Sequence, residues 1–415
     1  MKISTYYYPF LLFIAFSVFC IQESFGQVIA CENESFFADQ YSVSTPITVK
    51  YGENYNRLNQ LQELSMDIYE PDGDTSEVRP LIILAFGGSF IFGQRQDMAE
   101  LCKFFSRKGY VAATIDYRLY PLIIGLPDEA DMQDAAVKAV GDMKAAIRYF
   151  RQSVDDGNPY RIDPEIIMVG GLSAGSVTAL HTAYLDTTDD IPQNILDIID
   201  NNGGLEGSSG DSTNLTYSSD VNGVLNFSGA LFDVDVIDND DPPLASMHGT
   251  ADDVVPFLSG FAVNIIYMEG SGMIHPKADS VGVDNYLLAV PGGGHTDIYT
   301  DTAAYSLYQI EFLFNGVDFL RDIFCDYLSN TSEEAEKTAI QVFPNPAKDR
   351  LYIKTNTQES VSLYVADLQG KKITHIPSII DSEILHLDDY QPGMYLLYFL
   401  DRNGKHIKTE KFFVQ

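Results

Sequence analysis

One stretch of the chain, residues 165–185, constrains the fold more than any other. Residues 165–169 (Glu-Ile-Ile-Met-Val) are apolar after the first and predict a strand, whereas residues 177–185 have the spacing of a helix. Between them lies a G-x-S-x-G segment with Ser173 at its centre. Its two glycines permit a turn that is too sharp for a Cβ atom at either position. We therefore expect the Ser173 hydroxyl to stand exposed where the strand ends.

Apolar strands alternate with helices over most of the chain. We expect strands at residues 61–70, 81–85, 110–117, 165–169, 221–227, 243–247 and 286–290, and helices at residues 98–108, 129–153, 177–185 and 303–328. This alternation favours the α/β class, with a doubly wound, mostly parallel sheet and helices on both faces. Residues 186–220 break the pattern because they are rich in Asp, Asn, Gly, Ser and Thr. They are either a lid over a site or a plain surface excursion.

The composition changes near both ends of the chain. Residues 1–26 combine a basic start, a short apolar run and small residues before Gly26, which predicts a signal peptide. We expect a large domain at residues 27–328 and a polar linker at residues 329–338. Residues 339–415 contain short alternating strands separated by Gly-containing turns, which predicts a small all-β, immunoglobulin-like sandwich.

The charge balance limits the partners of the protein. Acidic residues outnumber basic residues 59 to 26, and the formal net charge is −33. A surface this acidic argues against a nucleic-acid partner and against anionic membranes. After the signal peptide, no segment is long and apolar enough to predict stable membrane insertion.

Three of the four cysteines remain once the signal peptide, with Cys20, is removed. Cys31 and Cys325 lie at the two ends of the large domain. A disulfide between them, which an oxidising compartment permits, would tie the N-terminus to the end of that domain. Cys102 lies among apolar residues at helical spacing, which predicts a buried free thiol.

Further segments that follow predicted strands supply what a serine nucleophile needs. His295, after three glycines, is the predicted general base, because an unperturbed imidazole pKa of ~6.5 suits proton transfer at neutral pH. Asp252 is the predicted acid that orients this base, with Asp253 as the alternative. Capping of a following helix is the other role that we expect of an aspartate here. This chemistry requires no metal and no organic cofactor.

The loop after the strand at residues 81–85 carries consecutive glycines. We predict that the amide of Gly88 or Ser89, together with that of Ala174, stabilises an oxyanion. A weaker prediction assigns the substrate pocket to three aromatic residues, which as often only pack at strand ends: Phe86, Phe90 and Tyr117.

The chain order Ser173, Asp252, His295 is that of α/β-hydrolases, and residues 60–328 resemble the secreted esterases of this fold. Residues 86–90 (Phe-Gly-Gly-Ser-Phe) resemble the H-G-G-G-F of carboxylesterase and hormone-sensitive-lipase-like enzymes, with Phe in place of His and Ser in place of the third Gly. Residues 116–119 (Asp-Tyr-Arg-Leu) match a strand of that family. Residues 247–256 are similar to the acid loop of many esterases, including those that act on feruloyl and acetyl groups of plant polysaccharides. The resemblance implies a secreted serine hydrolase that cleaves a small-molecule or polysaccharide-linked ester through an acyl-enzyme.

Residues 341–415 resemble the C-terminal sorting domain of the type IX secretion system. Residues 343–346 (Phe-Pro-Asn-Pro) and 392–395 (Pro-Gly-Met-Tyr) carry this resemblance. It implies that the type IX machinery is a partner and exports the protein, by way of the periplasm, to the surface or surroundings of a Gram-negative bacterium, with removal of the domain.

Two other functional classes stay open. A serine peptidase of the same fold would need a propeller or an acidic pocket for the substrate amine, and the sequence has no propeller repeats. A non-catalytic binding protein on this scaffold usually lacks one member of the triad, whereas Ser, Asp and His are all present.

Overall fold

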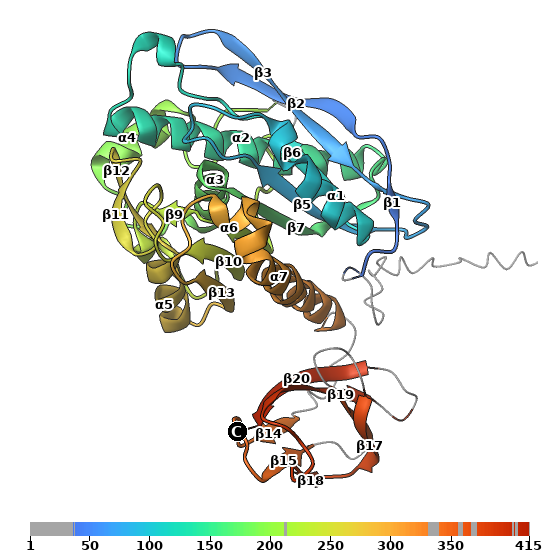
Figure 1. The fold of residues 1–415 in the computed structure, drawn as a ribbon. Coiled ribbons are helices and arrows are strands. Elements are labelled where there is room, and N and C mark those ends of the chain that lie inside the picture. Colours follow the sequence, from blue (N-terminus) through green and yellow to red (C-terminus); the bar gives the residue numbers. More distant parts are fainter. Residues whose placement is uncertain are drawn as a thin grey trace, which may run out of the picture.

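The structure, a computed structural model, describes residues 36, 38–210, 214–330, 340–355, 360–366, 372–400, 402 and 406–414 of the 415. Its buried apolar side chains form two separate cores, one between residues 36 and 320 and the other between residues 340 and 414. Figure 1 shows the corresponding α/β part and the smaller β part, in red.

An eight-stranded sheet forms the centre of the α/β part. In spatial order its strands are β13 (Asn285–Val290), β10 (Leu244–Gly249), β8 (Gly223–Phe227), β7 (Ile162–Leu172), β5 (Arg79–Ala85), β6 (Val111–Ile115), β3 (Leu61–Tyr69) and β2 (Ile47–Tyr55). All neighbouring pairs from β13 to β6 are parallel, and only β3 and β2 are antiparallel additions at one edge. The predicted mostly parallel sheet is therefore confirmed.

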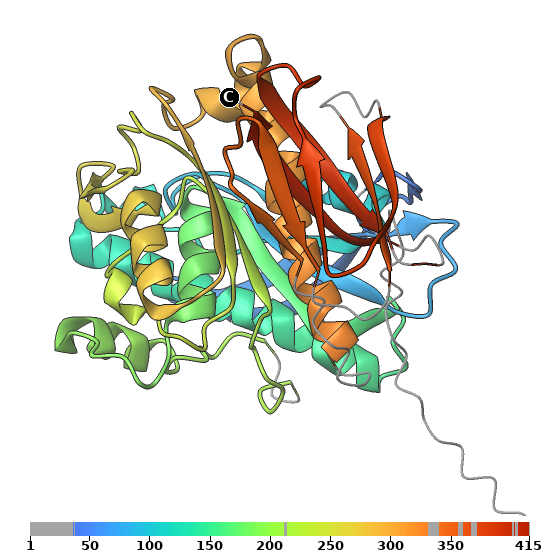
Figure 2. The same ribbon diagram turned by 90° about the horizontal axis from the view of Figure 1, so that it is seen from below.

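Helices cover both faces of this sheet. Figures 1 and 2 show α1 (Ala99–Arg107) and α7 (Thr302–Asn330) on one face, and α2 (Glu129–Asp155) and α3 (Ala174–Tyr184) on the other. α2 begins with a capping box, in which the side chains of Asp128 and Asp131 each accept a hydrogen bond from the other's backbone amide. Its inner face is rich in alanine, which lets a long helix approach the sheet and α3 closely.

Several elements were not expected from the sequence. They are β2, the hairpin of β11 (Ser259–Ala262) and β12 (Ile266–Gly270), the helix α5 (Ser271–Val281), the short helix α6 (Asp297–Thr300), the 3-10 turns η1 (Arg95–Met98), η2 (Leu122–Ile124) and η3 (Val234–Val236), and the two-residue strands β1 (Ser42–Val43), β4 (Pro71–Asp72) and β9 (Ala230–Leu231). Most are short or lie at the edge of a sheet, whereas α5 contains Gly272 and Pro276, which disfavour a helix.

Residues 186–220 contain α4 (Gln193–Asn201) and pack along α2. Glu206 accepts hydrogen bonds from Lys144 and Arg148 of α2 at 3.1 and 3.0 Å. Among the described residues, the hydrogen bonds of this segment do not reach Ser173, Asp252 or His295. Its function as a lid stays a prediction.

The C-terminal part is a pair of antiparallel sheets. One contains β14 (Gln341–Phe343), β15 (Arg350–Lys354) and β18 (Ser382–His386), and the other contains β17 (Lys372–Ile379), β16 (Val361–Ala366), β19 (Gly393–Leu400) and β20 (His406–Val414). Inward side chains alternate with outward ones, so that Leu363, Leu397 and Phe399 are fully buried. The predicted all-β sandwich is confirmed.

The predictions at the chain ends and for the cysteines have different outcomes. The signal peptide, Cys31 and most of the linker lie outside the described residues. Cys102 is buried and free, as predicted, and Cys325 is disulfide-bonded. The identity of its partner, predicted as Cys31, stays a prediction. Of the helices that the structure describes, none has the length and apolar character needed to cross a membrane.

Candidate active site

Four loops meet at one edge of the central sheet. They follow β5, β7, β10 and β13, which are parallel to one another within the same sheet. Because the carboxyl ends of parallel strands lie on the same side, these loops bring together residues that are far apart in the sequence.

Ser173 occupies the turn between β7 and α3. Its φ and ψ of 55° and −119° lie outside the regions that non-glycine residues usually adopt. A Cβ atom on Gly171 would lie 2.4 Å from the carbonyl carbon of Gly175, and one on Gly175 would lie 2.1 Å from the carbonyl oxygen of Ala85. The turn therefore requires both glycines, and the amide of Ser173 holds it to β8 by donating to Phe227 O at 2.8 Å.

A continuous hydrogen-bonded chain joins Ser173, His295 and Asp252. His295 Nε2 lies 2.8 Å from Ser173 Oγ, and His295 Nδ1 lies 2.7 Å from Asp252 Oδ2. A carboxylate only accepts, so Nδ1 carries the proton and Nε2 is left to accept the serine proton. The side chain of His295 is 9% exposed and that of Asp252 is fully buried.

Backbone and imidazole donors surround the Asp252 carboxylate. The amides of Val254 and Val255 both donate to Oδ1 at 2.9 Å. Burial would raise the pKa of Asp252, but hydrogen bonds from His248 and His295 and from the backbone lower this pKa far more, to well below its ordinary value. Asp252 is thus ionised at neutral pH. Within the described residues, no hydrogen bond joins the exposed Asp253 to His295.

The loop after β5 lies directly against Ser173. A Cβ atom on Gly87 would lie 3.3 Å from the Ser173 Cβ. Gly88 and Ser89 have φ values of 128° and 55°, so Ser89 has a left-handed backbone although it is not glycine. In the described part of the chain, the amides of Gly88, Ser89 and Ala174 have no hydrogen-bond partner. They are the three amides that the sequence singled out.

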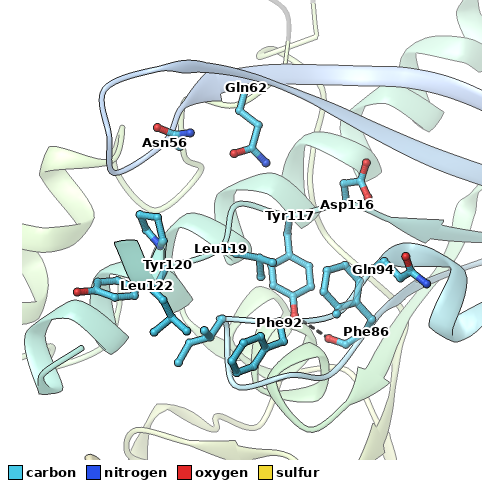
Figure 3. Close-up of a pocket in the computed structure, with 13 residues that line it drawn as sticks. Asn56, Gln62, Phe86, Phe92, Gln94, Asp116, Tyr117, Leu119, Tyr120 and Leu122 are labelled. Atoms are coloured by element: carbon cyan, nitrogen blue, oxygen red, sulfur yellow. Dashed lines mark hydrogen bonds between the residues drawn. The ribbon is translucent and has the colours of Figure 1, made fainter. Parts of the chain in front are cut away.

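A cavity of about 620 Å³ is lined in part by this loop. Figure 3 shows Phe86, Tyr117 and Phe92 among its lining residues, with Asn56 and Gln62 facing them from the β2–β3 hairpin. The Tyr117 hydroxyl donates to Phe86 O at 2.7 Å, and the two rings stack with centroids 4.3 Å apart.

Two of the three aromatic residues predicted for the pocket therefore line this cavity. Phe90 does not line it and packs edge-on against Tyr117. Ser173, Asp252 and His295 are not among its lining residues, which include Phe86 and residues 91–94 of the loop after β5.

Sequence reasoning missed two parts of this region. Two polar residues of the cavity wall, Asn56 and Gln62, belong to the hairpin whose first strand was not predicted. His248 was not singled out from the sequence, yet its Nε2 lies 3.3 Å from Asp252 Oδ2. Its spacing of four residues before Asp252 was the available signal, although spacing alone does not show where a loop side chain points.

Two known families match separate parts of the chain. Residues 66–235 match the BD-FAE family, and residues 341–415 match the secretion system C-terminal sorting domain. Together with the fold, the first match defines an esterase-like α/β-hydrolase, an enzyme of the carboxylic ester hydrolase class. The chain carries a BD-FAE domain followed by a type IX secretion sorting domain, and the latter indicates secretion or a cell-surface location.

Solved structures with a similar fold include esterase 2 of Thermogutta terrifontis. Its apo form is 21% identical with a TM-score of 0.46, its form phosphorylated by paraoxon is 22% identical with a TM-score of 0.46, and its propionate-bound form is 21% identical with a TM-score of 0.45. Each alignment covers 69% of this chain and 95% of the esterase chain. No curated protein sequence matches the chain.

Proposed function

We propose that the protein hydrolyses carboxylic esters with Ser173 as nucleophile, His295 as general base and Asp252 as the acid that orients His295. The observation that carries this proposal is the pair of hydrogen bonds, 2.8 and 2.7 Å long, that joins the three side chains in one line. The hydroxyl stands on a strained turn and its partner imidazole has the tautomer that accepts a proton.

The reaction has two steps. Ser173 Oγ attacks the ester carbonyl while His295 Nε2 takes its proton and then delivers it to the leaving alcohol. Water, activated by the same imidazole, then attacks the acyl-enzyme and releases the acid. The partnerless amides of Ala174 and of Gly88 or Ser89 are suited to stabilise the negative oxygen in both tetrahedral intermediates.

We further propose that one side of the ester occupies the cavity beside the oxyanion loop. Its aromatic rings and its amide side chains suit a substrate with both apolar and hydrogen-bonding parts, either a small molecule or an ester linked to a polysaccharide. The sorting domain supports export by the type IX machinery of a Gram-negative bacterium, by way of the periplasm, with removal of the domain after export.

The test is Ser173→Ala. We expect turnover of a p-nitrophenyl ester to fall by about 10⁴–10⁶-fold and labelling by a fluorophosphonate to disappear. Ser280→Ala is the control, because Ser280 is exposed on α5 and contacts only Lys277 O of its own helix. Labelling of the Ser173→Ala protein at the wild-type rate would exclude Ser173 as the nucleophile.

A further inference from the structure

A second imidazole contacts the acid of the proposed triad. His248 lies near the end of β10 and is completely buried. Its Nε2 lies 3.3 Å from Asp252 Oδ2 and 3.1 Å from Val255 O. Both oxygens only accept hydrogen bonds, so Nε2 carries a proton. This N–H donates to Val255 O, and the Asp252 carboxylate lies within ion-pair distance of it.

The other nitrogen of His248 is held from behind. Nδ1 lies 2.9 Å from Ser271 Oγ at the start of α5, and this oxygen receives a hydrogen bond from Asn226 Nδ2 at 3.2 Å. Because Ser271 Oγ already accepts from Asn226, its own proton is available to donate to Nδ1. Such a donation fixes His248 as the neutral imidazole with its proton on Nε2.

Asn226 is itself fixed at the end of β8. Its Oδ1 accepts from the amide of Gly229 at 2.8 Å, and its Nδ2 also donates to Ser246 Oγ at 3.0 Å. Asn226, Ser246 and Ser271 are all fully buried. Four buried polar side chains therefore form a series that leads to the proposed triad, in the order Asn226, Ser271, His248 and Asp252. Asn226 and His248 lie on β8 and β10, and Ser271 lies at the start of α5.

We propose that His248 is a positioning residue for ester hydrolysis, which holds the Asp252 carboxylate and its loop in the orientation that His295 requires. This inference rests on the proposed function. His248 touches no reacting atom and acts through Asp252. Val255 connects His248 to Asp252, because its carbonyl oxygen accepts a hydrogen bond from His248 and its amide donates one to Asp252.

The effect on the reaction is twofold. The geometric effect comes from the hydrogen bond of His248 Nε2 to Val255 O, which holds the loop that carries Asp252, whereas the contact of 3.3 Å with Oδ2 acts electrostatically. This contact withdraws some negative charge from the oxygen that faces His295 Nδ1. Without it, the imidazolium form of His295 is more stable, and the acid limb of the rate profile moves to higher pH. The titratable groups that surround His248 are Asp252, His295 beyond it, and His275 on α5.

The experiment compares His248→Phe with His248→Gln in the full chain. Phenylalanine keeps a ring but has no N–H, whereas the glutamine amide can still donate from the Nε2 position. For His248→Phe we expect kcat to fall about 10–50-fold with KM within about 2-fold, and the acid limb to move to higher pH. His248→Gln should recover most of kcat and the wild-type pH profile. Rates are divided by the concentration of sites labelled by a fluorophosphonate, so that unfolded protein does not count.

His181→Phe is the matched control. This histidine is also buried and hydrogen-bonded at both nitrogens, to Val177 O at 2.8 Å and from Phe232 N at 3.2 Å, but it is not connected to Asp252. It should lower the melting temperature and leave the pH profile of the labelled sites unchanged. Ser271→Ala is the second variant, should His248→Phe fail to fold. It keeps the imidazole but removes the donor to Nδ1, and we expect a fall in kcat of about 3–10-fold.

Two results would overturn the inference. One is a folded His248→Phe, or a folded Ser271→Ala if the former does not fold, with wild-type kcat and pH profile. The other is an equal loss in His248→Phe and His248→Gln with no change of pH profile. The Ser173→Ala variant distinguishes a failure of the His248 inference from a failure of the proposed function. If Ser173→Ala is inactive while the other variants are normal, only the role of His248 is wrong, whereas an active Ser173→Ala removes the triad itself.

Discussion

At the scale of single residues, hydrogen-bond donors surround the carboxylate of Asp252, the proposed acid. Asp252 receives hydrogen bonds from two backbone amides and from His295, and His248 Nε2 lies 3.3 Å away; these neighbours lower its pKa despite its burial. Its folded-state pKa is therefore below its unfolded value of ~3.9, so that ionised Asp252 contributes stability above pH ~4 and this contribution is lost as the pH falls further. An acid limb of activity near neutral pH would therefore require the titration of a group other than Asp252.

The first prediction concerns Asp252→Asn. An amide in this position presents an N–H₂ or a weaker acceptor to His295, which disturbs the tautomer that the reaction needs, and we expect kcat to fall by about 10³–10⁴-fold. Steady-state kinetics with a p-nitrophenyl ester measure this. Asp253→Asn is the matched control, because Asp253 is exposed beside it, and it should change kcat by less than about 2-fold. The reverse order of effects would make Asp253 the acid.

The second prediction concerns the glycines of the serine turn. Gly175→Ala would place a Cβ atom 2.1 Å from Ala85 O, which is backbone and cannot move without shifting β5. We expect a fall in the melting temperature and a loss of activity of more than about 100-fold. Gly260→Ala is the control, since its added Cβ would make only ordinary contacts, 3.5 Å from Pro256 Cβ, in the β11 strand. Thermal unfolding and ester turnover of both proteins decide the matter, and a fully active Gly175→Ala would contradict the close packing of this turn.

At the scale of elements, the loop around η3 gathers aspartates that repel one another. Burial, followed by repulsion from Asp186, Asp238 and Asp240, raises the pKa of Asp241 to about 7. A raised folded-state pKa means that the stability contributed by this group is present below pH ~4 and is lost as the pH rises through about 7. The charge of Asp241 therefore destabilises the folded state at neutral and alkaline pH.

The third prediction follows from this destabilising effect of the charged Asp241. Asp241→Asn keeps an oxygen for the amide of Asp238, which now donates to Asp241 at 2.8 Å, and removes the charge. We expect it to stabilise the protein at pH 8 by ~1 kcal/mol, or about 2–4 °C in melting temperature, and to have little effect at pH 4. Asp240→Asn, at an exposed position, should give a smaller gain. A lower melting temperature for Asp241→Asn at pH 8 would show that this carboxylate is needed in its charged form.

The elements that sequence analysis could predict are those whose pattern is set by burial on a regular period. The parallel strands were predicted because β5 is apolar from Leu81 to Ala85, β6 is apolar except at Thr114, and both are buried on both faces. α5 was missed because Gly272 and Pro276 argue against a helix, whereas the burial of Ile274 and Ala278 outweighs that local preference.

The site was predictable to the same extent. A serine between two glycines, and a histidine and an aspartate after strands, are signals in the sequence. The contact of His248 with Asp252 and the wall formed by Asn56 and Gln62 depend on how loops and an edge hairpin return to the sheet. The paths of these loops depend on tertiary packing, which a residue pattern with a period of two or 3.6 does not predict.

At the scale of the whole molecule, hydrolysis and export belong to separate cores. The buried residues of the α/β part and those of the sandwich form two clusters with no member in common. Each of the four loops that form the candidate site follows a strand of the first cluster. The matches divide in the same way, since the BD-FAE match ends at residue 235 and the sorting-domain match begins at residue 341.

The fourth prediction is that residues 27–330 fold alone and hydrolyse esters with the kcat/KM of residues 27–415, within about 2-fold. The cut after Asn330 keeps α7 whole and keeps Cys325 with its disulfide. Thermal unfolding of the longer protein should then contain the transition of the shorter one at an unchanged temperature, because independent cores unfold independently. In cells, the shorter protein should be retained in the periplasm of a host that has type IX secretion, whereas the longer one is exported. A loss of activity or of the melting transition on removal of residues 331–415 would mean that the sandwich supports the hydrolase and does more than direct its export.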